Sequence, residues 1–196
     1  MQTDLETILI TEDQIAKRLD DIAAQLVADL PNENGQPAEL TLVPIMTGAV
    51  VFVADLIRRI PTMLRLQTVA ISSYRGATTP GQAHLDRGLT SLPDDLSGRH
   101  VVLVDDILDS GQTLTMAQQQ LRDLNPDSLK TCVLLRKPTP AANTVPAEYV
   151  GFDIPDRFVV GYGLDLAGYY RNLPMIAIPR PEVIERLTQP ATTSSH

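Results

Sequence analysis

The chain alternates between stretches whose apolar residues recur every three or four positions and short runs of continuous apolar residues. The first pattern predicts helices, and the second predicts strands buried in a sheet. The predicted helices are a stretch that follows a capping-box pattern at residues 11–14 and ends before Pro31, residues 49–60, residues 113–124 and a short C-terminal turn. The predicted strands are residues 40–46, 66–73, 100–104, 129–135, 149–152, 158–160 and 174–178.

The order of these elements predicts the fold class. Strands that alternate with helices are typical of an α/β protein with a doubly wound, parallel sheet, and we expect one domain over residues 1–196. Residues 74–90 are polar, rich in glycine and without periodicity, and a loop of this length in a compact domain is usually functional or mobile. We expect the core at about residues 40–178 and a flexible tail at residues 189–196.

Composition and charge narrow the class of protein. Among 196 residues, 43% are hydrophobic and 20% are charged, as in a folded domain with a real core. The formal net charge is −8 and the basic residues are scattered, so we expect no nucleic-acid partner. The N-terminus lacks a signal-peptide pattern, and no apolar run approaches the ~18 residues of a membrane span. With a single cysteine, Cys132, these features predict a reduced, cytoplasmic protein with no membrane partner.

The segment at residues 101–113 (VVLVDDILDSGQT) carries the clearest sign of a binding site. Asp105 and Asp106 end a predicted strand, and open parallel sheets bind ligands beyond the carboxyl ends of their strands. The turn that follows leads into a helix, whose free amide groups can bind a phosphate. Carboxylates beside an anion repel it unless Mg²⁺ or ribose hydroxyls intervene, so the pattern favours a sugar phosphate with a metal. The alternatives are a solvated strand end and an ordinary helix N-cap.

This segment resembles the phosphoribosyl pyrophosphate (PRPP) loop of type I phosphoribosyltransferases. Residues 135–138 (LRKP) and 154–174 (IPDRFVVGYGLDLAGYYRNLP) are similar to the hypoxanthine-guanine branch of that family, and the likeness spans roughly residues 40–178. The resemblance implies a mainly parallel sheet with a small hood subdomain formed by the chain ends. It also implies purine salvage: transfer of the phosphoribosyl group from PRPP to N9 of hypoxanthine or guanine, with Mg²⁺ as cofactor and a homodimer or homotetramer as the assembly.

The resemblance also implies roles for the residues of the loop. Asp109 would act as the general base or acid for the proton on N7 of the purine, as a suitably placed carboxylate can. Mg²⁺ would be held by Asp105, Asp106 and Asp165. The ribose and 5′-phosphate would be bound by Asp105, Asp106, Ile107, Leu108, Asp109, Ser110, Gly111, Gln112 and Thr113.

Further residues are implied for the purine and for pyrophosphate. The residues implied for the purine are Lys137 as donor to the 6-oxygen, Phe158 as stacking partner, Val159 through its carbonyl, and Asp165. The residues implied for pyrophosphate are Thr47, Gly48, Arg171, and Ser73 with Tyr74 from a mobile lid. The family has Leu-Lys-Gly where this chain has Met46-Thr47-Gly48, so a lysine is missing from the turn. Read singly, Lys137, Asp165 and Arg171 could be surface charges, and Phe158 could belong to the core.

Two other classes of function remain as alternatives. A PRPP-sensing regulatory protein of the same fold would bind PRPP without catalysis, but Asp109 and Lys137 are retained and a basic face is missing. A receiver-type signalling domain also places an acidic pair at the end of a strand. In a receiver, however, that pair closes the first strand and the phospho-acceptor aspartate closes a third one, and this chain has neither order.

Overall fold

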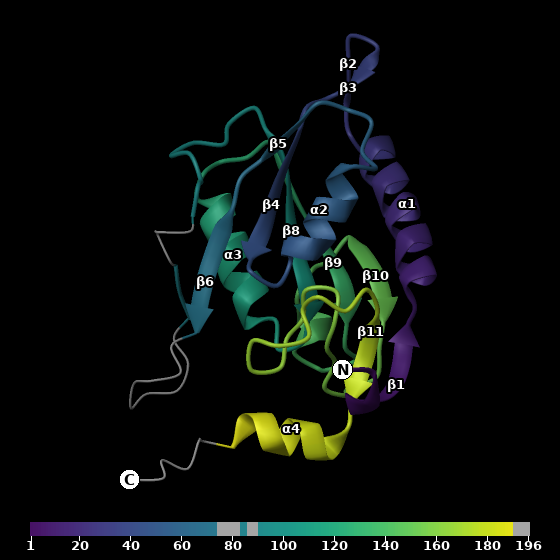
Figure 1. The fold of residues 1–196 in the computed structure, drawn as a ribbon. Helices are drawn as coiled ribbons and strands as arrows, with labels where there is room; N and C mark the ends of the chain where they lie inside the picture. The colour runs from purple at the N-terminus through teal and green to yellow at the C-terminus, as the bar shows by residue number, and fades with distance from the viewer. Residues whose placement is uncertain (74–82, 86–89, 190–196) are drawn as a thin grey trace.

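The computed structural model describes residues 1–73, 83–85 and 90–189 and has a seven-stranded main sheet (Figure 1). The strand order is β10-β9-β8-β4-β6-β7, with β5 also paired to β4, and only the β6–β7 pair is antiparallel. The strands of this sheet are β4 (Leu40–Met46), β5 (Leu64–Leu66), β6 (Val69–Ser73), β7 (Ala83–Leu85), β8 (His100–Leu108), β9 (Ser128–Arg136) and β10 (Tyr149–Asp153). The predicted doubly wound, mainly parallel sheet is confirmed.

Helices cover both faces of the main sheet, because the apolar side chains of its central strands point alternately to either face. Along β8, Val102 and Val104 pack into one core cluster with α1 and α2, whereas Val101 and Leu103 pack into another with α3. Successive residues of a strand point to opposite faces, so a continuous apolar run serves both layers. The helices are α1 (Glu12–Ala28), α2 (Val50–Ile57), α3 (Gln112–Arg122) and α4 (Pro181–Thr188), and two 3₁₀ turns span Gln2–Asp4 and Ala142–Thr144.

The two ends of the chain form a separate small sheet. β1 (Leu5–Ile10) pairs antiparallel with β11 (Ile176–Pro179), and Figure 1 shows this pair near the end of the main sheet toward which β4 and β6 point. The hood implied by the resemblance is therefore present. The sequence pattern did not predict β1, because the pairing that stabilises it joins residues about 170 positions apart. A further two-stranded pair, β2 (Asn32–Glu33) with β3 (Gln36–Pro37), lies within the predicted loop at 31–37.

The structure corrects several predicted boundaries. The predicted strand at 66–73 is two strands, β5 and β6, which both pair with β4. The predicted strand at 158–160 is wrong: Val160 makes only an isolated bridge to Ala177. The strand predicted at 100–104 continues through the acidic pair to Leu108. Tyr74, most of the predicted loop at 74–90 and residues 190–196 of the predicted tail lie outside the described residues.

Candidate active site

The acidic pair lies within the sheet rather than in the turn beyond it. In the ladder with β9, Asp105 pairs with Val133 and Ile107 pairs with Leu135. The chain then turns at Ser110 and Gly111 into α3. Gly111 is the N-cap residue, with a φ of +73°, and no described side chain caps the helix start. Asp109 is therefore not an ordinary N-cap, and the first amide groups of α3 remain available to an anion.

A pocket of about 410 Å³ lies at this end of the sheet, as the rule for parallel sheets predicts. It brings together four parts of the chain: the end of β4, β6, the segment from the acidic pair into α3, and the loop before β11. Most of the sequence-predicted residues line it, whereas Leu108, Gln112, Lys137, Phe158 and Val159 do not. The lining residues are Ile45, Met46, Thr47, Gly48, Ile71, Asp105, Asp106, Ile107, Asp109, Ser110, Gly111, Thr113, Leu114, Asp165 and Arg171.

The acidic pair lines this pocket, with Asp105 buried and Asp106 half-buried. Asp105 is only 6% exposed, and its Oδ1 accepts a hydrogen bond of 3.0 Å from the backbone N–H of Asp106. Burial, and next the charge of Asp106, raises the pKa of Asp105 well above its usual range. Burial also raises the pKa of Asp106, although the nearby Arg171 charge opposes this shift. Both carboxylates would therefore gain from a cation or from hydroxyl donors in the pocket.

The turn after β4 lies directly against Asp106. A Cβ at Gly48 would overlap the Asp106 carboxylate, so a larger residue at this position would displace that side chain. The peptide bond between Met46 and Thr47 is cis. Ser73, like Thr47 and Gly48, was predicted to contact pyrophosphate. It is the last residue of β6 and lies three positions beyond Ala70, which pairs with Met46 of β4. The ends of β4 and β6 therefore lie side by side, and Ile71 of β6 lines the pocket together with Thr47 and Gly48.

Arg171 and Asp165, which lie in the loop before β11, form an ion pair in the same pocket. Arg171 Nη2 lies 2.7 Å from Asp165 Oδ1, and its Nη1 donates to the Gly163 carbonyl at 2.5 Å. Asp165 Oδ2 also accepts from the Gly168 amide at 2.7 Å. Gly163 has a φ of +102°, and a Cβ there would collide with the Gly48 carbonyl oxygen. The loop that carries both charged groups therefore packs directly on the turn after β4.

Lys137 does not line the pocket itself but pairs with Asp109, which does. Its Nζ lies 2.8 Å from Asp109 Oδ2 and 3.3 Å from Asp156 Oδ1, and Lys137 is only 9% exposed. Lys137 is therefore not a surface charge. Phe158 is 44% exposed, so it does not belong to the core and is accessible to a planar ligand, whereas Val159 is buried.

A magnesium ion fits the donors in the pocket. Carboxylate oxygens are the ligands that Mg²⁺ prefers, and it usually keeps water and substrate oxygens alongside one or two carboxylates. Asp105, which is buried, and Asp106, which is half-buried, provide two neighbouring carboxylates in the pocket. Among the described residues, no three acidic, histidine or cysteine side chains cluster closely enough to hold a metal by themselves. Asp165 lines the same pocket but is paired with Arg171, so the three predicted ligands do not form a closed protein cage.

Sequence reasoning missed the apolar lining and one polar contact behind it. Ile45, Ile71 and Leu114 line the pocket, yet they read as ordinary core positions. Tyr162 donates a hydrogen bond to Asp55, and nothing in the spacing of these residues indicates that they meet. Only the packing of the loop on α2 brings them together.

Comparison with known proteins agrees with this geometry. The defining pattern of the phosphoribosyl transferase domain matches residues 8–166. The hypoxanthine-guanine phosphoribosyltransferase of Mycobacterium tuberculosis is 40% identical over 185 residues, which cover 93% of this chain and 90% of that protein. The protein of the same name from Bacillus subtilis is 36% identical, with coverage of 94% of this chain and 99% of that one.

Solved structures lead to the same family. A hypoxanthine phosphoribosyltransferase from Staphylococcus aureus superimposes with a TM-score of 0.82 at 37% identity, covering 93% of this chain and 96% of that one. A mutant of the Trypanosoma cruzi hypoxanthine phosphoribosyltransferase, complexed with the product IMP, gives a TM-score of 0.83 at 32% identity, covering 95% and 97%. These matches show that this chain belongs to the type I phosphoribosyltransferase family, in its hypoxanthine-guanine branch.

Proposed function

We propose that this protein is a purine salvage enzyme that transfers the 5-phosphoribosyl group of PRPP to N9 of hypoxanthine or guanine. The products are IMP or GMP and pyrophosphate. The observation that carries the proposal is that the turn before α3, the acidic pair and Arg171 meet in one pocket. A PRPP sensor without catalysis is not favoured, because relatives that match most of the chain are named as transferases.

The ribose 5-phosphate end of PRPP would bind at the turn before α3. The amide groups of residues 109–113 would bind the phosphate, because they are at the positive end of the helix dipole. The Asp105 and Asp106 carboxylates would accept hydrogen bonds from the ribose hydroxyls. Arg171, the Gly48 turn and the Ser73–Tyr74 segment would hold pyrophosphate, which leaves from the opposite side of the pocket.

Magnesium would be held by Asp105 and Asp106, with Asp165 as a further ligand. When bound, it neutralises charge that develops on the pyrophosphate oxygens as the C1′–O bond breaks. The chain itself offers little positive charge, since Arg171 is the one basic side chain among the described residues that line the pocket. Four carboxylates line the same pocket: Asp105, Asp106, Asp109 and Asp165. PRPP is a polyanion, so we expect its binding to depend strongly on the metal.

The purine would bind between Phe158 and the Lys137–Asp109 pair. Lys137 would donate to the 6-oxygen, Phe158 would stack on the ring, and the Val159 carbonyl and Asp165 would contact the ring edge. N9 attacks C1′ as the pyrophosphate oxygen departs, and Asp109 takes the proton from N7. Catalysis then depends on positioning and on neutralising the leaving group, as expected for a transition state with positive charge on the ribose.

We further propose a cytoplasmic location and a homodimer or homotetramer as the assembly. The described residues contain no helix of the length and apolar character needed to cross a membrane. The net charge of −8 does not favour a nucleic-acid partner.

Purified protein tests the proposed reaction directly. With PRPP and Mg²⁺, we expect hypoxanthine and guanine to be converted to nucleotides with release of one pyrophosphate each, while adenine stays unreacted. Removing the metal with a chelator should abolish turnover, and added Mg²⁺ should restore it. Binding of PRPP without conversion of any of four bases, hypoxanthine, guanine, xanthine and adenine, would instead support the sensor.

Replacing Lys137 with methionine should remove much of the activity toward 6-oxopurines. Methionine keeps the length of the side chain but not its hydrogen-bond donor, so kcat/KM for hypoxanthine should fall by about 100-fold. Adenine, whose 6-amino group accepts no such bond, should stay unreacted in the variant as in the wild type, so the loss is measured on hypoxanthine. Lys130→Met is the matched control, because Lys130 also pairs with a carboxylate, Asp29, at 3.0 Å but does not approach the pocket. Equal losses for hypoxanthine in both variants would contradict the assigned role.

A further inference from the structure

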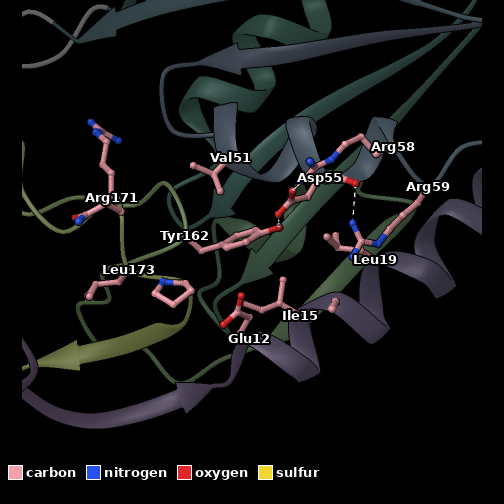
Figure 2. A pocket seen from close by; sticks show the side chains of 13 residues that line it. Glu12, Ile15, Leu19, Val51, Asp55, Arg58, Arg59, Tyr162, Arg171 and Leu173 are labelled. Atoms are coloured by element: carbon pink, nitrogen blue, oxygen red, sulfur yellow. Dashed lines mark hydrogen bonds and ion pairs between the residues drawn. The ribbon is translucent and has the colours of Figure 1, made fainter.

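A second pocket, of about 440 Å³, adjoins the candidate active site and shares Arg171 with it. Its walls come from α1, α2 and the segment at 162–174. Figure 2 shows Tyr162 of that segment pointing toward Asp55 of α2. The Tyr162 hydroxyl donates to Asp55 Oδ2 at 2.6 Å. None of the roles proposed above uses this hydrogen bond.

The surroundings of Tyr162 and Asp55 favour this hydrogen bond. Tyr162 is only 5% exposed, and burial, followed by the hydrogen bond to Asp55, raises the pKa of its hydroxyl, so that it stays a donor. The other carboxylate oxygen of Asp55 accepts from Arg58. A buried hydroxyl without a hydrogen-bond partner is costly, so the burial of the Tyr162 hydroxyl stabilises its contact with Asp55.

The contact joins the two segments that form the pyrophosphate side of the active site. Asp55 belongs to α2, which begins directly after the Thr47–Gly48 turn. Tyr162 precedes Gly163, whose carbonyl accepts from Arg171 and whose Cα packs against the Gly48 carbonyl. The backbone at Tyr162 has a φ of +50°, which is uncommon for a tyrosine and requires support from neighbouring contacts.

We propose that the Tyr162–Asp55 hydrogen bond is a positioning contact that sets the distance between Arg171 and the Thr47–Gly48 turn. Tyr162 touches no reacting atom, and it acts through Gly163 and Arg171. Loss of the contact should therefore lower the affinity for PRPP and pyrophosphate and leave the affinity for the purine unchanged. This inference rests on the proposed function, because it concerns the binding of that function's donor substrate.

Tyr162→Phe tests the contact by removing one hydroxyl oxygen. We expect the KM for PRPP to rise about fivefold to tenfold, with the KM for hypoxanthine changed by less than about twofold. Tyr149→Phe is the matched control, since Tyr149 is 4% exposed and donates to Asp29 at 2.7 Å. Tyr149 lies near His100 and Ser128, which begin β8 and β9, at the opposite end of the sheet from the active site. Tm should fall in both variants, but the KM for PRPP should rise only in Tyr162→Phe.

Asp55 provides a second pair of variants. Asp55→Ala removes the acceptor and should reproduce the rise in the KM for PRPP, whereas Asp55→Asn keeps an acceptor oxygen and should restore most of the wild-type value. Calorimetric Kd values for PRPP with Mg²⁺ are measured alongside. Equal PRPP values for Tyr162→Phe and Tyr149→Phe, or no difference between the two Asp55 variants, would overturn the positioning role.

The calorimetric Kd values for PRPP test this inference independently of the proposed reaction. Wild-type protein that binds PRPP without turnover would contradict the proposed reaction, and the Kd comparison would still decide whether the contact positions the site. Wild-type protein without PRPP binding would overturn both.

Discussion

Turnover of hypoxanthine should fall by about 1,000-fold when Asp109 is replaced by asparagine, because positioned proton transfer contributes about 100-fold to 10,000-fold to such reactions. Asparagine keeps the size of the side chain but cannot take the N7 proton. The KM for PRPP should change by only a few fold, since the amides of the phosphate turn are not altered. Steady-state kinetics with each substrate varied in turn measure both effects.

Asp156→Asn is the matched control for that experiment. Asp109 and Asp156 both pair with Lys137, at 2.8 Å and 3.3 Å, but only Asp109 lines the pocket. If the loss in Asp109→Asn came only from disturbing Lys137, Asp156→Asn should show a similar loss. We expect its kcat to stay within about threefold of wild type, because the Asp156 carboxylate is exposed and Lys137 keeps its closer partner, Asp109. Equal losses of kcat and of PRPP affinity in Asp109→Asn would contradict a role in proton transfer.

The KM for PRPP should rise by about 100-fold in Arg171→Gln, which corresponds to about 2.7 kcal/mol. Arg171 is the one basic side chain among the described residues lining the pocket, and no lysine occupies the turn at Thr47 to share its role. The substitution also leaves the Asp165 carboxylate without its partner, which adds negative charge where pyrophosphate should bind. The KM for hypoxanthine should change far less. The ratio of the KM for PRPP to the KM for hypoxanthine therefore shows whether the substitution acts on PRPP binding.

Arg136→Gln provides the comparison for Arg171. Arg136 pairs with Asp153 at 2.7 Å and its side chain is 37% exposed, against 2.7 Å and 36% for Arg171 with Asp165. Arg136 does not line the pocket, so its KM for PRPP should stay within about twofold of wild type. A rise in Arg171→Gln no larger than in Arg136→Gln would show that Arg171 does not hold pyrophosphate.

Local patterns in the sequence determined the layered fold and the location of the site. The run at β8 is apolar on both faces and therefore predicted a central strand, and the capping box at Thr11 is present in the structure with both of its hydrogen bonds. The acidic pair and the turn after it form one continuous segment, from which the phosphate site was predicted. These features depend on neighbours close in sequence, which is why they could be read without the structure.

Contacts between distant segments could be decided only by the tertiary structure. β1 forms because it meets β11, and the acidic pair stays in the sheet because β9 continues beside it. The ion pair of Arg171 with Asp165 lines the same pocket as the acidic pair, and its loop approaches the turn after β4 because Gly163 packs against Gly48. The Tyr162–Asp55 contact likewise joins segments far apart in the sequence. Periodicity specifies which face of an element is buried, but long-range packing decides which side chains meet there.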